Sequence, residues 1–191
     1  MKRFGLILFL FLGLNNFISS QCTFSINEID EFDSTLVIAT PSVNIGYLIA
    51  SEYLEEDGIK LIEEAKVILS YGELGEYSNM FLTLVTPERS FSEIEPGTNL
   101  LLKLSNDTIV GLINYPDRGT FDRDINMRIY NHTAIIPIDV FFALAHYPIE
   151  KIRINYSNKK RNINVTPDQA GEILKHIRCL GEGAGLLPIQ P

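Results

Sequence analysis

The chain has 191 residues, of which 46% are hydrophobic, and its formal net charge is −8. This length is enough for one domain with its own hydrophobic core, and no internal repeat or low-complexity linker indicates a second domain. An acidic chain disfavours nucleic acid as a partner, because the phosphates would repel it.

The first residues have the pattern of a secretory signal. Lys2 and Arg3 precede an apolar run from Phe4 to Leu14, and small residues end at Ser20. The run has eleven residues, whereas a membrane-spanning helix needs about 20. We therefore predict a signal peptide over residues 1–20 and an exported product in the periplasm, on the outer surface or outside the cell. Its removal leaves 14 basic and 24 acidic residues, a net charge of −10.

Two cysteines, Cys22 and Cys179, lie near the ends of the mature chain. Two cysteines in an exported protein indicate one disulfide, and their wide separation does not fit the paired spacing of a zinc site. A lipid anchor at Cys22 is the alternative. Gln21 disfavours it, because lipoprotein processing requires a small residue before the cysteine.

Strands are predicted wherever apolar and polar residues alternate or β-branched residues gather. They cover residues 23–32, 35–40, 66–71, 77–86, 100–104, 108–113, 134–138, 149–156 and 162–165. Residues 51–64 have partly helical spacing that Asp57 and Gly58 interrupt, so an irregular excursion is expected there. Residues 116–124 are polar and are predicted to form an exposed loop.

Two helices are predicted. Residues 140–147 form a short inner helix that ends at Pro148. Thr166 to Gln169 has the pattern of a capping box, and an apolar stripe follows at helical spacing. This helix is expected to stop at Gly181, with His176 and Arg178 in its last turn and a flexible tail over residues 181–191.

The fold class that follows is α+β. We expect one β-rich domain over residues 21–180, mainly an antiparallel sheet with a short inner helix. The C-terminal amphipathic helix is expected to pack on that sheet.

Several segments also carry a resemblance. They are Cys22 with the run Asn27-Glu28-Ile29-Asp30-Glu31-Phe32, then residues 102–106, 109–110 and 148–154, and finally Cys179-Leu180. In these the chain resembles a group of small exported bacterial proteins with an N-terminal Cys-x4-Asn-Glu-Ile-Asp-Glu-Phe motif and a C-terminal Cys. The resemblance implies a single domain with a paired cysteine near each end. It implies no particular activity.

Catalytic and metal-binding patterns are weak in this sequence. It has neither a nucleophile elbow nor a phosphate-binding glycine loop, and its three histidines are far apart in sequence. Asp122, Asp124 and Asn126 have the oxygen spacing of a calcium loop, but Met127 replaces the required glycine and no glutamate closes the loop. A solvated acidic loop is the favoured interpretation, and no cofactor is predicted.

Five basic residues concentrate near one predicted hairpin: Lys151, Arg153, Lys159, Lys160 and Arg161. They could dock an acidic protein or an anionic polymer, or simply solvate a sheet face and protect an edge strand. The leading hypothesis is a non-enzymatic binding or structural module of the cell envelope or extracellular space. The alternatives are an envelope protein lipid-anchored at Cys22, and a calcium- or carboxylate-dependent enzyme of unrecognised type using carboxylates such as Asp117, Asp122 and Asp124.

Overall fold

The computed structural model describes residues 22–55, 58–115 and 117–186. The predicted signal segment lies outside these residues. The described chain is mostly antiparallel β-sheet with two helices, one short and one C-terminal. The predicted α+β fold class is therefore confirmed.

The described residues form two sheets. The large sheet has seven strands in the order β1 (Ile26–Ile29), β2 (Leu36–Ala39), β4 (Gly58–Leu74), β5 (Tyr77–Glu88), β9 (Met127–Ile136), β8 (Thr120–Asp122), with β3 (Val43–Glu55) also pairing with β4. The small sheet has the order β11 (Lys160–Asn164), β10 (Ile149–Asn155), β6 (Leu100–Leu104), β7 (Ile109–Leu112). The strand pairs in both sheets are antiparallel.

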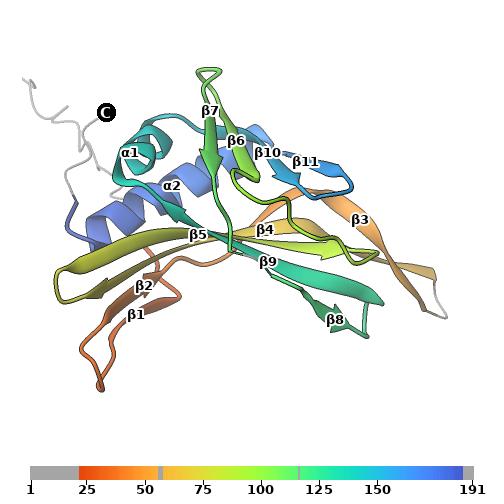
Figure 1. The fold of residues 1–191 in the computed structure, drawn as a ribbon, viewed down its shortest axis with the longest axis horizontal. Coiled ribbons are helices and arrows are strands. Elements are labelled where there is room, and N and C mark those ends of the chain that lie inside the picture. The colour runs from red at the N-terminus through yellow and green to blue at the C-terminus, as the bar shows by residue number, and fades with distance from the viewer. Residues whose placement is uncertain (1–21, 56–57, 116, 187–191) are drawn as a thin grey trace, which may run out of the picture.

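The small sheet and the two helices, α1 (Ile138–His146) and α2 (Pro167–Gly183), lie over the same face of the large sheet (Figure 1). The core fills the space between these layers. Leu82 and Leu84 of β5, Leu102 of β6 and Ile152 of β10 are fully buried there. Apolar residues alternate along these strands, so one face of each sheet packs on the core and the other faces away from it.

Helix α2 forms where the capping box predicted it. The side chain of Thr166 accepts from the Gln169 backbone N–H, and the side chain of Gln169 accepts from the Thr166 N–H. Ala170, Ile173 and Ile177 are buried and pack on the core. The helix continues to Gly183 and does not stop at Gly181. His176 and Arg178 therefore lie inside it and not in its last turn, and residues 181–183 are helical where a tail was predicted.

Strands β3 and β4 pair with each other over long stretches on both sides of residues 56–57, so the irregular excursion predicted over 51–64 is wrong. Strand β3 pairs with β4 through two register shifts, between Ile45 and Leu48 and between Ala50 and Leu54. At the first shift Gly46 has a positive φ of 76°, and its backbone N–H and C=O both pair with the Gln169 amide. These bulges interrupt the two-residue periodicity by which a strand is recognised.

The two cysteines are joined, as predicted. Cys22 and Cys179 form a disulfide with a Cα–Cα distance of 5.3 Å across a sequence separation of 157 residues. The bond ties the segment before β1 to α2. It also occupies the Cys22 sulfur, which a lipid anchor would need. Among the described residues no helix is long and apolar enough to cross a membrane.

Candidate functional site

A buried carboxylate lies where the two sheets meet. Glu88 ends β5 and is only 5% exposed. Its oxygens accept hydrogen bonds from Lys159 Nζ at 2.7 Å and from Arg161 Nη1 at 2.7 Å. Both basic residues come from the β10–β11 hairpin and its turn, so this triad joins the small sheet to the large one.

The hydrogen bonds continue from Glu88 through the interior. The Tyr156 hydroxyl donates its single proton to Glu88 Oε1 at 3.0 Å, so it accepts from His132 Nε2 at 2.9 Å. The other ring nitrogen of His132 then accepts from the Asn114 side-chain amide at 3.3 Å. We call the set Asn114, His132, Tyr156, Glu88, Lys159 and Arg161 the polar seam.

The protonation states of the seam are fixed by burial and charge. Desolvation lowers the pKa of His132 to about 4 and raises the pKa of Tyr156. Burial alone would raise the pKa of Glu88, but the charge of Arg161 and hydrogen bonds from Lys159 and Arg161 outweigh it and lower that pKa. Near neutral pH His132 and Tyr156 are therefore neutral and Glu88 is anionic. The hydrogen bonds of the seam thus join Tyr156 and the β10–β11 hairpin to Glu88 of the large sheet.

Arg161 also closes a gap between two strands. Registered pairing between β4 and β5 begins at Lys66 with Val85, and before that point the strands part. Arg161 donates to the backbone carbonyls of Pro87 at 2.6 Å and Glu64 at 3.0 Å. The guanidinium thus supplies donors to carbonyls beside the gap.

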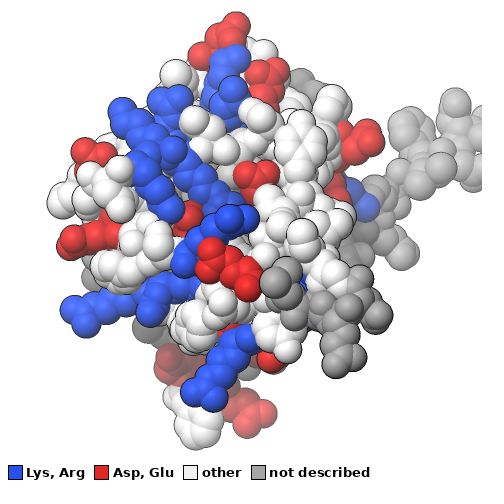
Figure 2. Space-filling model, turned by 90° about the vertical axis from the view of Figure 1, so that its right-hand side faces the viewer, with Lys and Arg blue, Asp and Glu red and all other residues white. Residues whose placement is uncertain are grey.

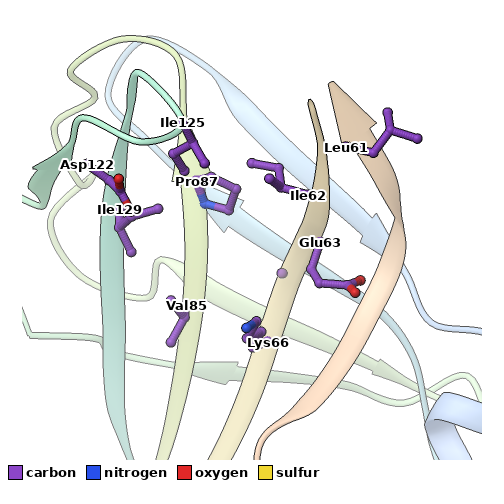
Figure 3. A pocket seen from close by; sticks show the side chains of 10 residues that line it. Leu61, Ile62, Glu63, Lys66, Val85, Pro87, Asp122, Ile125 and Ile129 are labelled. Carbon is purple, nitrogen blue, oxygen red and sulfur yellow. The ribbon is translucent and has the colours of Figure 1, made fainter. Parts of the chain in front are cut away.

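A cleft of about 420 Å³ lies over the same region. Figure 3 shows its lining side chains, which come from β4, β5, β8, β9 and the β8–β9 turn. Most are apolar, including Ile62, Val85 and Ile129, whereas Glu63, Lys66 and Asp122 add charges of both signs. This mixture defines no single ligand chemistry.

The five predicted basic residues divide between two places. Lys159 and Arg161 point inward to Glu88. Lys151, Arg153 and Lys160 belong to the alternate positions of β10 and β11, whose outward side chains are exposed or half-exposed. The two-residue periodicity of β11 explains the split, because Arg161 and Ile163 share its inner face.

The outward basic residues are joined by one that sequence reasoning missed. Lys103 of β6 is the registered partner of Lys151, and Leu101 is the partner of Arg153. We call Lys103, Lys151, Arg153 and Lys160 the basic face. The end of the molecule at which β11 lies is rich in Lys and Arg (Figure 2).

The basic face contains a shallow hollow of about 200 Å³. It is lined by Leu101, Lys103, Ile109, Lys151 and Arg153. Asn162 lies on the same face and accepts from Arg153 Nε at 2.6 Å, which orients the guanidinium. The hollow therefore combines two apolar side chains with three cationic ones.

The calcium candidates lie at the β8–β9 turn. Asp122 ends β8, and its Oδ1 accepts from the Asp124 backbone N–H at 2.8 Å. Asn126 has a positive φ of 54°, as the turn requires. Asp117 lies apart from this turn. Its two oxygens accept from the Gly119 and Asn131 backbone N–H groups.

The three histidines lie in separate environments. His132 is fully buried in the seam, His146 Nδ1 contacts the Phe142 carbonyl at 2.8 Å, and His176 lies on the buried side of α2. The two-residue periodicity of β9 could have indicated His132, which shares the core-facing positions of Tyr130 and Ala134. Thr86 and Glu88 continue the core-facing positions of Leu82 and Leu84, which marks them as buried polar residues.

The seam predicts a specific pH dependence. Because the pKa of His132 falls from 6.5 to about 4, the unfolded chain binds a proton within this window that the folded chain does not. Stability is therefore lost as pH falls from 6.5 towards 4, by about 3 kcal/mol for this group. Urea unfolding of wild type and His132→Gln, near neutral pH and at about pH 4, should show a weaker pH dependence for the variant. Equal pH dependence in both proteins would contradict the assignment.

No protein-family model, curated protein or solved structure matches this chain.

Proposed function

We propose that this chain is an exported, non-enzymatic binding module that docks an acidic protein segment on its basic face. The observation that carries the proposal is the gathering of Lys103, Lys151, Arg153 and Lys160 on one face of the small sheet. The chain as a whole has a net charge of −8. A positive face on a negative protein directs an acidic partner to one place.

The inner architecture supports a rigid platform for this face. Lys159 and Arg161 anchor the β10–β11 hairpin to Glu88, while β10 pairs with β6 on its other side. The backbone positions that carry the outward side chains are therefore held by strand pairing on both sides of β10. A preordered surface loses less conformational entropy on binding than a mobile one.

The hollow favours a protein segment over a uniform anionic polymer. Leu101 and Ile109 offer apolar contact beside Lys103, Lys151 and Arg153. A ligand that contacts both the apolar and the cationic side chains needs an apolar side chain flanked by carboxylates. Protein segments combine these groups, whereas a polyuronate offers only charge and hydroxyls.

Export is the second part of the proposal. The Cys22–Cys179 disulfide is compatible with an oxidising compartment. Residues 1–20 have the order of a secretory signal. Both features suit a protein that acts at the cell envelope or outside the cell.

The test is a titration of the disulfide-bonded mature protein with poly-L-glutamate at low ionic strength. We expect the triple variant K151S/R153S/K160S to weaken binding at least about tenfold, since each desolvated charge pair contributes to affinity. The control K66S/R123S/K175S removes the same number of positive charges elsewhere and should bind as wild type does. Added salt should weaken wild-type binding.

Two outcomes would overturn the proposal. Equal losses in the two triple variants would show that net charge alone, and not the basic face, attracts the probe. Tighter binding of polyuronate than of poly-L-glutamate, lost in K151S/R153S/K160S, would assign the face to a polysaccharide.

A further inference from the structure

The β1–β2 hairpin presents an unusual tip on the other side of the molecule. Residues 30–33, Asp30-Glu31-Phe32-Asp33, follow β1, and we call them the acidic tip. The Phe32 side chain is 99% exposed. An aromatic residue so fully exposed between three carboxylates buries nothing within its own chain.

The tip is held in a defined shape. Asp30 Oδ1 accepts from the Phe32 N–H at 2.8 Å, and the Asp30 carbonyl accepts from the Ser34 N–H at 2.9 Å. Asp33 Oδ1 accepts from the Thr35 N–H at 2.9 Å, and hydrogen bonds from Thr35 lower the pKa of Asp33. Phe32 is thus displayed on a hydrogen-bonded turn, beside an Asp33 carboxylate that is ionised at neutral pH.

The tip and the hollow of the basic face have complementary chemistry. The hollow has about 200 Å³ of space beside Leu101 and Ile109, whose side chains offer apolar contact to an aromatic ring. Cations that surround an aromatic ring attract its face, and they pair with carboxylates beside it. Lys151 and Arg153 are placed to do both, whereas Lys103 already pairs with Asp107 at 2.8 Å and Glu150 at 3.3 Å.

We infer that the acidic tip of one copy inserts Phe32 into the hollow of a second copy, so that the chain associates head to tail. The inference rests on the proposed function, because it names the acidic segment that the basic face takes. The tip and the small sheet lie on opposite sides of the molecule (Figure 1), which prevents a copy from filling its own hollow. A contact between two different surfaces leaves a free tip and a free hollow in each pair, so further copies can add to form an open chain or a closed ring.

Sedimentation velocity on the mature, disulfide-bonded protein tests the inference. Wild type should show an average mass that rises with concentration and falls with added salt. Phe32→Ser, which removes the tip aromatic, and K151S/R153S, which disables the hollow, should each weaken association at least about tenfold. Thermal melts of both variants should match wild type, since these side chains are exposed or half-exposed.

A mixture of the two variants gives the sharpest result. The Phe32→Ser copy keeps its hollow and the K151S/R153S copy keeps its tip, so an equimolar mixture should form one-to-one dimers and no longer species. Wild type that stays monomeric at every concentration, or a mixture that stays monomeric, would overturn the inference. If the protein stays monomeric but still binds poly-L-glutamate, the self-association inference fails and the proposed function stands. If it neither associates nor binds poly-L-glutamate, the inference and the proposed function both fail.

Discussion

Replacing Glu88 with alanine should lower the free energy of unfolding by about 3–5 kcal/mol, because it leaves the buried Arg161 guanidinium without its nearest carboxylate. Glu88 accepts from Lys159 and Arg161, both at 2.7 Å, and from the Tyr156 hydroxyl at 3.0 Å. The Arg161 side chain is 15% exposed and cannot turn to bulk water without breaking its bonds to Pro87 and Glu64. Urea unfolding at neutral pH measures the loss.

Glu150→Ala is the matched control for this prediction. Glu150 pairs with Lys103 at 3.3 Å, but both side chains are at least 40% exposed. An exposed ion pair contributes about 0–1 kcal/mol, so this variant should remain close to wild type. Similar losses in the two variants would show that Glu88 is not the buried anchor of the seam.

A double variant separates two effects of the Glu88→Ala change: the loss of the Glu88 side chain and the destabilisation by the unpaired Arg161 charge. E88L/R161M replaces the pair with apolar groups of similar length. Replacing a buried ion pair in this way is often neutral or stabilising, so part of the stability lost in Glu88→Ala should return. A double variant much less stable than Glu88→Ala would give a different result. It would indicate that the main contribution of Arg161 is its hydrogen bonds to the carbonyls of Pro87 and Glu64, and not its pairing with Glu88.

Removing the disulfide is the second change with a large expected effect. The Cys22–Cys179 bond spans a sequence separation of 157 residues. The chain-entropy model gives about 5 kcal/mol for a loop of this size, as an upper value. The double variant C22S/C179S should therefore unfold at a markedly lower urea concentration than the oxidised wild type.

Reduction of the wild type provides the comparison for the double variant. Both lack the cross-link, so the reduced wild type and C22S/C179S should unfold together, well below the oxidised protein. If the oxidised and reduced proteins unfold at the same urea concentration, the prediction is contradicted. The disulfide would then not stabilise the fold by restricting the unfolded chain.

The elements recognised from sequence are those with local signals that agree with their packing. Strand β10 alternates Ile152 and Ile154 with Lys151 and Arg153, and the structure buries the isoleucines. The start of α2 follows from the capping box at Thr166. The end of α2 was misplaced because Gly181 is a common stop signal, yet here it is buried within the helix.

The β3–β4 hairpin was missed for a physical reason. Its register shifts break the alternation at Ile45–Leu48, and Tyr47, Leu48, Ile59 and Leu61 stay exposed on strands that extend beyond the core. Apolar and polar residues alternate along a strand when one of its faces is buried. Strands without a buried face need not show this alternation. Local sequence therefore does not distinguish such strands from an irregular segment.

The candidate site was only partly predictable. Sequence placed Lys159 and Arg161 among the basic residues of one hairpin, but their direction depends on Glu88, which lies more than 70 residues earlier. Lys103 joins the basic face only through the pairing of β6 with β10. Contacts between distant segments are set by topology, which no local pattern records.

Backbone NMR of the mature protein during addition of poly-L-glutamate tests the docking surface most directly. The proposed function predicts that amide shifts concentrate in β6, β10 and β11, around Lys103, Lys151, Arg153 and Lys160. Shifts centred instead on Lys66, Arg123 and Lys175, or spread evenly over all exposed basic residues, would contradict it.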